Sequence, residues 1–519
     1  MNLIHDAWIP IRRKHGEETH IEPWEVTTRY NDDPIVALTA PRPDFNGALI
    51  QFLIGLLQTT CAPDSPRARR AWLHEPPTPE ELHAKLHHVA YAFELDSDDK
   101  RFMQDAELKS AGVKEATPIS ALLIDIPGEN TMQRNTDHFI KRGGVEKLCS
   151  ACTATTLFTL QTNAPAGGQG HRTGLRGGGP LTTLIMGDTL WQTAWLNVLE
   201  NTAFLAYSGD TGKAEPSHRF PWLASTRTSE KGSRTEKTTP LDAHPDQRFW
   251  AMPRRIWLLH ENVTLSEPCD ICGKAETKLY RQYLTKNYGV NYHGPWLHPL
   301  SPYNIDKDNQ PIPVHPQPGG IGYRHWVGLV ENNADNTRRI ARVVEQYRKL
   351  QRKDGRLWAF GYDMDNMKAR CWYDAEIPMI FVSEDMEAEY KGQIEAMLQA
   401  AQQVASEVRR HVKNALFGPK AEIRGDLSYI DGRFWSATEP IFYALLRRTR
   451  DVLNTGDDAS PLLHEWYTTL TRTAHRIFDD ASQTGDFNAA DPRRIACAWN
   501  ALNKALARKK LRELLKLAA

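Results

Sequence analysis

The sequence predicts an α+β protein in which a large mixed globular domain, residues 1–380, is followed by a C-terminal four-helix bundle, residues 381–519. Two observations predict this fold. The 519 residues exceed the usual size of one hydrophobic core, so we expect two domains. The last third has helical periodicity, whereas the first two thirds mix short strand-like runs with prolines and loops.

Within the first domain, the most apolar run is ALIQFLIGLLQ at 48–58. It is shorter than the roughly 20 residues that cross a bilayer, so it predicts a buried core helix. The N-terminal MNLIHDAWIPIR lacks the layout of a secretory signal, and we expect a cytoplasmic protein without a membrane segment. The polar stretch 211–246 predicts a long mobile loop. Aromatic runs around GYDMDNMK predict a β-hairpin with Asp363 and Asp365 at its tip.

Four helices are expected in the second domain. The first covers about 387–417. Ser436 and Glu439 have the spacing of a capping box, which predicts the start of a second helix before IFYALLRRTRDVL. Ser460-Pro461 and Asp491-Pro492 place a capping side chain before a proline and predict the third and fourth helices. Short connections between long helices favour a bundle.

Charge and motifs argue against several classes of function. Lysine plus arginine equals aspartate plus glutamate at 64 each, so any nucleic-acid binding must be local. The chain has no HExxH and no GxSxG motif, and we expect no enzyme. His83, His87 and His88 have a spacing that can chelate a metal on a helix, but solvent-exposed helix histidines are the commoner explanation.

Two CxxC motifs are the strongest chemical signal. Cys149 and Cys152 form the first, and Cys269 and Cys272 form the second. Four thiolates suit one tetrahedral structural zinc ion. The alternatives are redox-active cysteine pairs and buried thiols. Because Cys269 follows Cys152 by 117 positions, the fold would have to bring the two motifs together.

The segment NAPAGGQGHRTGLRGGGP at 163–180 contains seven glycines in eighteen residues. Glycine tolerates positive φ and has no Cβ, so such a segment either turns sharply or lets a partner approach the backbone. It lacks the Gly-Lys-Ser/Thr ending of a Walker loop and the spacing of a dinucleotide fingerprint. A pair of glycine turns and an accessible loop flanked by His171, Arg172 and Arg176 both remain open.

Together these motifs give the chain a resemblance to one family. MNLIHDAWIPIR, the glycine segment, LCSAC with TATTLF, CDICG, GPWLHPLSPY and FGYDMDN occur in the order of that family, with a helical bundle at the end. Over its whole length the chain resembles the large subunit of the type I-E CRISPR surveillance complex Cascade, the CasA family.

The resemblance implies a non-catalytic subunit that recognises the protospacer-adjacent motif of double-stranded DNA through the minor groove. Guide RNA then reads the target by base pairing, as in other RNA-guided effectors. The implied partners are the 5′ handle of the guide crRNA, the target DNA, the Cascade backbone and small subunits, and the helicase-nuclease. A scaffold that docks guide and partners without reading the motif is the alternative, and a hydrolytic enzyme is a third hypothesis.

The resemblance also implies roles for residues of this sequence. The minor-groove loop corresponds to Gly167, Gly168, Gln169 and Gly170, with 174–180 as a supporting turn. The wedge that enters the base stack corresponds to Asn366, where a family member has glutamine. Lys286, next to the aligned Asn287, is expected to touch the motif. The expected guide-docking residues are Ile124, Asp125, Arg134, Lys141 and Arg142. An added Cβ at Gly168 or Gly170 should reduce DNA recognition more than folding. Zinc would hold the guide-docking segment beside the glycine loop.

Overall fold

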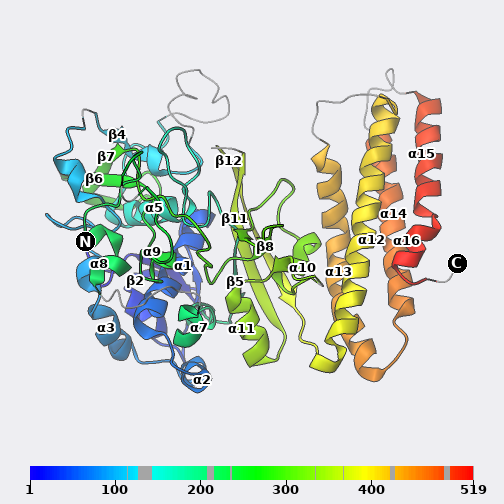
Figure 1. Ribbon diagram of the computed structural model, residues 1–519, viewed down its shortest axis with the longest axis horizontal. Coiled ribbons are helices and arrows are strands. Elements are labelled where there is room, and N and C mark those ends of the chain that lie inside the picture. The colour runs from blue at the N-terminus through cyan, green and yellow to red at the C-terminus, as the bar shows by residue number, and fades with distance from the viewer. Residues whose placement is uncertain are drawn as a thin grey trace. The chain divides into compact units, whose positions relative to one another are not determined.

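Two compact units make up the chain. The computed structural model describes all 519 residues except 114, 127–142, 207–214, 234–235, 334, 366–367, 421–426, 484–490 and 518–519. Unit 1 takes in Met1–Pro316, Ala334–Leu350 and Trp358–Asp374 (Figure 1). Unit 2 takes in Gln317–Asn333, Gln351–Leu357 and Ala375–Ala519. The bundle unit therefore also includes two short segments that come before residue 375 in the sequence.

Helix α1, Pro43–Cys61, forms the centre of unit 1 and confirms the buried helix expected at 48–58. A helix that is apolar on most sides needs cover on all of them. Phe52 shows how that cover is built: it is completely buried, and its ring packs edge-on against Trp8, Phe93, Phe158 and Trp250.

Four three-stranded sheets lie in the described part of the chain. The first has the order β2-β1-β3, with β1 Ile9–Arg13, β2 Glu18–Ile21 and β3 Ile35–Leu38. The second has the order β4-β7-β6, with β4 Thr117–Pro118, β6 Arg255–Pro268 and β7 Ala275–Lys286. The third has the order β10-β8-β9, with β8 Tyr303–Ile305, β9 Pro311–Pro313 and β10 Arg338–Arg339. The fourth has the order β12-β11-β5, with β5 Thr182–Met186, β11 Gly355–Asp365 and β12 Lys368–Met379.

Two long hairpins carry residues singled out from the sequence. Strands β6 and β7 pair antiparallel from Arg255↔Lys286 to Pro268↔Ala275, which leaves the second CxxC motif in the connecting loop. Strands β11 and β12 are neighbours and confirm the predicted hairpin. The position predicted for Asp363 is wrong, because it lies within β11 and not at the tip. It is buried there, 2.7 Å from the guanidinium of Arg370.

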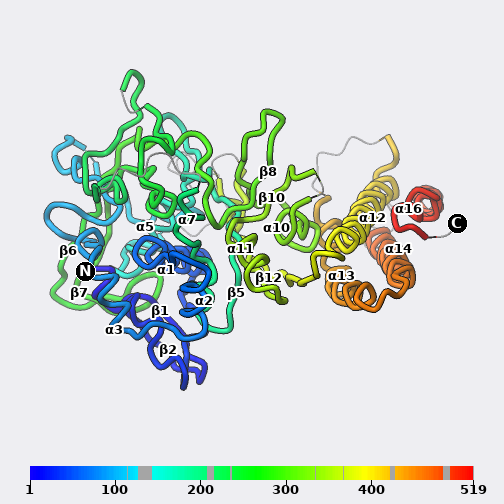
Figure 2. Tube along the Cα trace, turned by 60° about the horizontal axis from the view of Figure 1, so that its bottom comes forward, coloured from blue at the N-terminus to red at the C-terminus, as the bar shows by residue number. Residues whose placement is uncertain are grey.

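Shorter helices cover the sheets and α1 in unit 1 (Figure 2). Their bounds are α2 Pro66–His74, α3 Pro79–His87, α5 Ser150–Asn163, α6 Leu190–Leu196, α7 Asn201–Leu205, α8 Pro216–Arg219, α9 Gln247–Trp250 and α11 Arg342–Gln351. The 3-10 turns of this unit are η1 Pro23–Thr27, η2 Ala90–Ala92, η3 Ala106–Lys109, η4 Ile119–Leu122 and η5 Pro221–Leu223.

Most described residues of 211–246 form loops, as predicted, but short helical turns interrupt the segment and aromatic side chains anchor it. The segment contains α8 and η5, and Phe220 and Trp222 are each 1% exposed in the core of unit 1. The Trp222 indole donates a hydrogen bond to the carbonyl of Ala92. Two large aromatic side chains therefore anchor a stretch whose average composition is polar. Residues 211–214 and 234–235 lie outside the described residues.

The C-terminal bundle confirms the predicted fold class. Its helices are α12 Glu384–Phe417, α13 Ser428–Thr455, α14 Ser460–Gln483 and α15 Pro492–Leu506, followed by the short α16 Lys509–Leu514 (Figure 1). The predicted start at Asp491-Pro492 is confirmed, since the Asp491 carboxylate accepts from the backbone N–H groups of Arg493 and Arg494. Unit 2 also contains η6 Tyr323–His325 and α10 Trp326–Leu329.

The capping box predicted at Ser436 and Glu439 is wrong. Both residues lie inside α13, which begins at Ser428 and continues through Pro440. The Glu439 carboxylate accepts instead from the backbone N–H of Tyr323, 3.0 Å away. The Tyr323 ring stacks on Phe442 with centroids 4.5 Å apart. Packing against η6 thus outweighs the local signal for a helix start.

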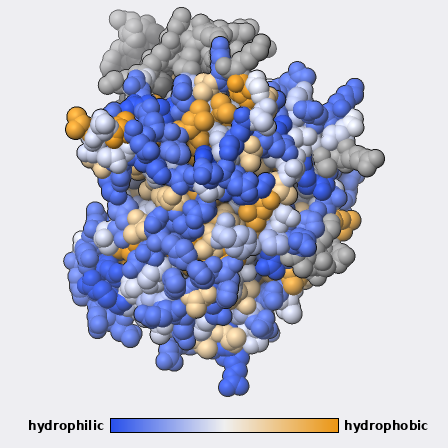
Figure 3. Space-filling model, turned by 90° about the vertical axis from the view of Figure 1, so that its left-hand side faces the viewer, coloured by the Kyte–Doolittle hydropathy of each residue, from blue (hydrophilic) through white to orange (hydrophobic). Residues whose placement is uncertain are grey.

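No helix among the described residues is both long and apolar enough to span a membrane. Figure 3 shows one face of the molecule, on which hydrophilic side chains dominate and hydrophobic ones form small separate groups among the residues drawn in colour.

Candidate metal centre and nucleic-acid interface

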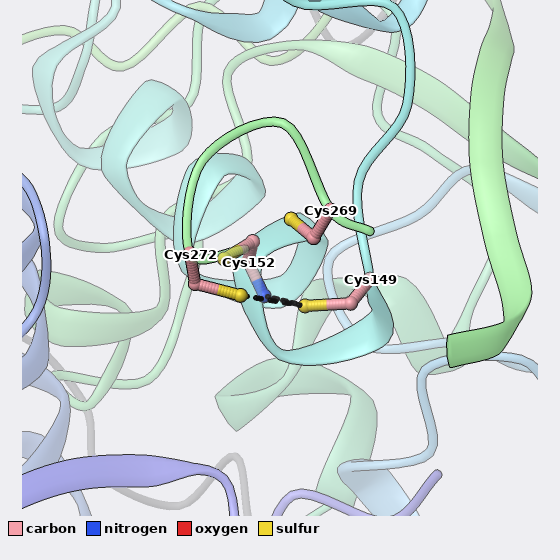
Figure 4. Close-up of side chains that lie close together, drawn as sticks. All are labelled: Cys149, Cys152, Cys269 and Cys272. Carbon is pink, nitrogen blue, oxygen red and sulfur yellow. Dashed lines mark hydrogen bonds between the residues drawn. The ribbon is translucent and has the colours of Figure 1, made fainter. Parts of the chain in front are cut away.

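Four cysteines from two distant segments meet in unit 1. Cys149 is the N-cap residue of α5 and Cys152 lies in its first turn. Cys269 and Cys272 lie in the loop between β6 and β7. The four side chains converge (Figure 4), with all sulfur atoms within 4.8 Å of one another. The fold therefore brings together the two CxxC motifs as the zinc prediction requires.

Backbone hydrogen bonds hold the two cysteine segments together. Leu148 and Tyr280 exchange a pair of backbone hydrogen bonds just before the first motif and within β7. The Asp270 carboxylate accepts from the backbone N–H groups of Glu146 and Lys147. Gly273 has a φ of +74°, and its N–H bonds to the Cys269 carbonyl, which closes the turn of the second motif. Hydrogen bonds that do not involve the sulfur atoms therefore hold the two cysteine segments side by side.

The sulfur geometry fits a tetrahedral metal. The Cys149 and Cys272 sulfur atoms are 3.7 Å apart, much longer than the roughly 2.05 Å of a disulfide. Sulfur atoms bonded to one zinc ion at about 2.3 Å lie roughly 3.8 Å from one another. Contacts with Cys149 and Cys152 lower the pKa of the Cys272 thiol to about 7. Contacts with the other three thiols, together with burial, raise the pKa of Cys152. Four thiolates this close repel one another unless a cation lies among them.

Helix α5 runs from the cysteine cluster to the glycine segment, over roughly 21 Å for its 14 residues. The segment then forms two parts. Residues 166–171, which we name the glycine tip, are exposed at Ala166, Gly168, Gln169 and His171. Residues 174–180, which we name the glycine turn, lead into β5.

Three carbonyl groups of the glycine tip accept hydrogen bonds from other parts of the protein or of the tip itself. The carbonyl of Gly168 accepts from the N–H of His171, that of Gln169 from the Asn287 side chain at 2.8 Å, and that of Gly170 from the Tyr288 N–H at 2.8 Å. In contrast, the backbone N–H groups of 167–170 have no acceptor within the described residues. These four residues therefore carry unpaired backbone N–H donors. Three of the four are glycines, so Gln169 is the one residue among them with a side chain.

Residues at the end of β7 support this tip. Tyr288 has the unusual φ of +63°, and its hydroxyl accepts from the Gln169 side chain at 2.9 Å. Backbone strain of this kind concentrates at functional sites. The Arg172 guanidinium lies over the Tyr288 ring and donates to the Ser229 hydroxyl and carbonyl. The tip is therefore held from its base by β7 and by the segment around Ser229.

Arg254 fixes the protonation of His171. Its guanidinium donates to Nδ1 of His171 and to the carbonyl of Pro165. Burial, and then the charge of Arg254, lower the pKa of His171, so this imidazole is neutral at neutral pH. With Nδ1 accepting, the proton lies on Nε2. His171 thereby adds a further hydrogen-bond donor to the exposed glycine tip.

The glycine turn is packed. A Cβ at Gly174 would lie 2.5 Å from the Thr162 carbonyl oxygen, and one at Gly179 would lie 2.7 Å from the Cβ of Tyr362. Arg176 is buried and donates to three neutral acceptors on Gln51, Thr182 and Ser301. Residues 174–180 therefore form a closely packed turn.

The structure places the other predicted residues as follows. The Lys286 ammonium donates a hydrogen bond to the carbonyl of Ala111. Ile124 is 9% exposed, and the Asp125 carboxylate is 3.0 Å from the Arg42 guanidinium. Arg134, Lys141, Arg142 and Asn366 lie outside the described residues.

Sequence reasoning misses the tip supports Asn287, Tyr288 and Arg254. The alignment column of a motif-contacting lysine falls on Asn287, and the preference for a cation there points to its neighbour Lys286 instead. Only the three-dimensional contact with Gln169 shows what Asn287 does. No local pattern marks Arg254, whose partners precede it by more than eighty positions.

A polar network joins the predicted guide-docking segment to the β11–β12 hairpin. Arg42 pairs with Asp125 and with Asp44, and the Tyr362 hydroxyl donates to the Asp44 carboxylate at 2.6 Å. Tyr362 also packs on Gly179 of the glycine turn. The hairpin, the glycine turn and the segment at Asp125 therefore share one support.

Comparisons with known proteins agree with this architecture. Residues 2–477 match the family model of the CRISPR-associated protein Cse1. Among solved structures, Cse1 of Thermobifida fusca has a TM-score of 0.75 at 15% identity and covers 100% of this chain and 99% of its own. CasA of Thermus thermophilus has a TM-score of 0.67 at 17% identity, covering 99% of each chain. A chain described as a CRISPR RNA-guided surveillance complex has a TM-score of 0.68 at 14% identity, covering 98% of this chain and 99% of its own. These structures share the fold of the chain. Because the family match spans nearly the whole sequence, the chain belongs to the CRISPR-associated Cse1 family, also named CasA, as its motifs predict.

Proposed function

We propose that this chain recognises a short adjacent motif in double-stranded DNA through the minor groove, as a non-catalytic subunit of a CRISPR RNA-guided surveillance complex. The observation that carries this proposal is the hydrogen bonding of the glycine tip. Its carbonyl groups are bonded inward, while the N–H groups of 167–170 have no acceptor among the described residues. An exposed row of donors without bulky side chains calls for a partner that presents acceptors close to a surface.

The floor of the minor groove presents such acceptors. Adenine N3 and thymine O2 face the groove in both orientations of an A·T pair, so a row of backbone donors reads them permissively. The groove is only about 6 Å wide, which favours a tip without Cβ atoms at Gly167, Gly168 and Gly170. The Nε2–H of His171 and the Arg172 guanidinium add donors at the edge of the tip, for acceptors or phosphates.

In this proposal, the β11–β12 hairpin opens the DNA duplex. Asn366, between β11 and β12, acts as a wedge that enters the base stack next to the motif. Support comes from the strand ends next to this connection, where Arg370 pairs with Asp363 and Tyr362 packs on the glycine turn. The loop that binds the motif and the hairpin that carries the wedge would thus be held together by the contact between Tyr362 and the glycine turn.

Guide docking is assigned to the segment after η4. Ile124 anchors this segment in the core, and Asp125 is held by Arg42. Arg134, Lys141 and Arg142 supply the cations that phosphates of the crRNA 5′ handle require. The remaining partners are the Cascade backbone and small subunits and the helicase-nuclease, all in the cytoplasm. With a formal net charge of zero, the chain depends on these neighbours to hold most of the DNA.

The metal in the cysteine cluster is proposed to be zinc. Four sulfur donors with spacings near those of a tetrahedral thiolate site fit this ion. Such a site leaves no position open for a reacting water, so its role is structural. Bound zinc would fix the start of α5, the helix that leads to the glycine tip.

Binding to duplexes that differ only in the adjacent motif tests the proposal. The assembled complex, with wild-type chain or with alanine at 167–170, is titrated with duplexes that carry a favourable or an altered motif. Wild type should discriminate between the two duplexes, and the variant should lose that discrimination while it still assembles with guide RNA. A second variant, Asn366→Ala, should keep motif discrimination and lose strand opening, measured by permanganate reactivity of unpaired thymines.

The scaffold alternative makes the opposite forecast. If this chain only docks guide and partners, both variants should bind and open DNA as wild type does. That outcome would end the recognition proposal. A metal-dependent nuclease activity of the isolated chain would in turn favour the hydrolytic hypothesis.

A further inference from the structure

Three histidines from two segments lie together at the N-terminal side of unit 1. His5 lies in the segment before β1, and His83 and His87 are one turn apart on α3, which lies beside that segment (Figures 1 and 2). The ring centroid of His5 is 5.2 Å from that of His87 and 5.5 Å from that of His83. The two helix histidines have centroids 5.9 Å apart.

These separations match three imidazoles around one metal ion. With metal–nitrogen bonds of about 2.0–2.1 Å, imidazole centroids around a tetrahedral ion lie roughly 5.2 Å apart. Nδ1 of His87 and Nε2 of His5 are 3.1 Å apart, close to the roughly 3.3 Å expected for two nitrogen ligands of the same ion. As the side chains stand, the nitrogen atoms of all three histidines do not converge on one point, so the His83 ring would have to turn about its side-chain torsions to complete the set.

The environment keeps the nitrogen atoms available. The imidazole of His83 has no hydrogen-bond partner among the described residues and contacts the Trp24 ring edge-on. A neutral, unprotonated nitrogen is the form that binds metal. Asp6 and Glu94 provide negative charge near His5.

We propose that His5, His83 and His87 bind one divalent transition-metal ion, with the fourth position open to water. Imidazole ligands suit Zn²⁺, Ni²⁺ or Cu²⁺, whereas Mg²⁺ and Ca²⁺ require oxygen ligands. The ion joins the N-terminal segment to α3, across 78 positions of sequence. The site is independent of the cysteine cluster, with which it shares no residue.

Ni²⁺ titration of the tag-free full chain tests the site, by calorimetry and by the shift in unfolding temperature. His5→Ala and His87→Ala should each weaken Ni²⁺ binding at least about tenfold, because each removes one of three ligands. His88→Ala is the matched control, since His88 is the exposed neighbour at the end of α3 and lies outside the cluster. It should bind Ni²⁺ as wild type does, and Mg²⁺ should produce no shift in any variant.

Acidification gives a second readout. Protons compete with metal ions for imidazole nitrogens, so Ni²⁺ affinity should fall as the pH is lowered. Circular dichroism without metal verifies that the alanine variants fold. Ni²⁺ binding that is equal in wild type, His5→Ala and His87→Ala, or that is lost equally in His88→Ala, would overturn the proposal.

Discussion

The glycine tip and the glycine turn are neighbours in one segment, with the same residue type and opposite surroundings. At Gly168 in the tip, a Cβ would meet no atom within 4 Å. At Gly174 in the turn, a Cβ would lie 2.5 Å from a backbone oxygen. Packing therefore requires glycine at position 174, whereas it leaves room for a side chain at position 168. The comparison separates glycines required by the fold from glycines free to serve a ligand.

Gly170 shows that packed and unpacked glycines are not divided by the limits of the glycine tip and the glycine turn. It belongs to the tip, yet a Cβ there would lie 3.0 Å from the Asn287 Cβ and 3.1 Å from the Tyr288 ring. A Cβ at Gly170 would therefore also disturb packing against Asn287 and Tyr288, so an effect on recognition there could not be separated from an effect on folding. Gly168 is the position at which recognition and support can be separated.

The largest expected effect on stability comes from the other end of α5. Removing the metal ligands with Cys149→Ser and Cys272→Ser should abolish zinc binding and lower the stability of unit 1 by on the order of 5 kcal/mol or more. Elemental analysis and urea unfolding followed by tryptophan fluorescence measure this. Cys371→Ser, outside the cluster, is the control and should retain one zinc per chain. Metal equally absent from wild type and from the double variant would remove zinc from the proposal.

Gly174→Ala should have the next largest effect. Its Cβ would overlap the Thr162 carbonyl oxygen, and the backbone of both segments would have to move. We expect a loss of about 3 kcal/mol in the free energy of unfolding, as for other overpacked sites. An unfolding midpoint equal to that of wild type would show that the turn is not the rigid support inferred from its contacts.

The bundle, the cysteine cluster and the hairpin were predictable from sequence because each has a local signature. Periodic apolar spacing marks helices, CxxC spacing marks a pair of ligands, and Asp-rich turns between aromatic runs mark a hairpin. Each signal depends on residues close together in the chain. The meeting of Cys152 with Cys269 could be expected only as a condition of the zinc hypothesis.

Features that depend on distant partners were not predictable. The Ser436 and Glu439 pattern has the form of a helix start, but Tyr323 and Phe442 extend the helix through it. Composition likewise hid the buried Trp222 in a polar stretch. In the candidate site, only the hydrogen bond to the Gln169 carbonyl shows that Asn287 supports the glycine tip. All three features depend on tertiary contacts.

Two variants at the end of β7 compare a residue that supports the glycine tip with its neighbour, and their expected effects on stability are smaller. Asn287→Ala removes the hydrogen bond to the Gln169 carbonyl and should cost about 1 kcal/mol of stability, together with weaker motif binding. Lys286→Ala, one position away, loses only an exposed contact with Ala111 and should leave folding unchanged. Motif affinity of the assembled complex is the second measurement. A loss confined to Lys286→Ala would instead support Lys286 as the residue that contacts the motif.

Gly168→Ala tests the central claim most directly. Gly168 and Gly16, in the β1–β2 turn, have φ values of +81° and +95°, and neither has an atom within 4 Å of an added Cβ. Alanine at either position should therefore cost a similar amount of stability, about 1 kcal/mol. In the assembled complex, Gly168→Ala should weaken binding to motif-bearing duplex while Gly16→Ala binds as wild type does. Equal motif affinity in the two variants would contradict recognition through the glycine tip.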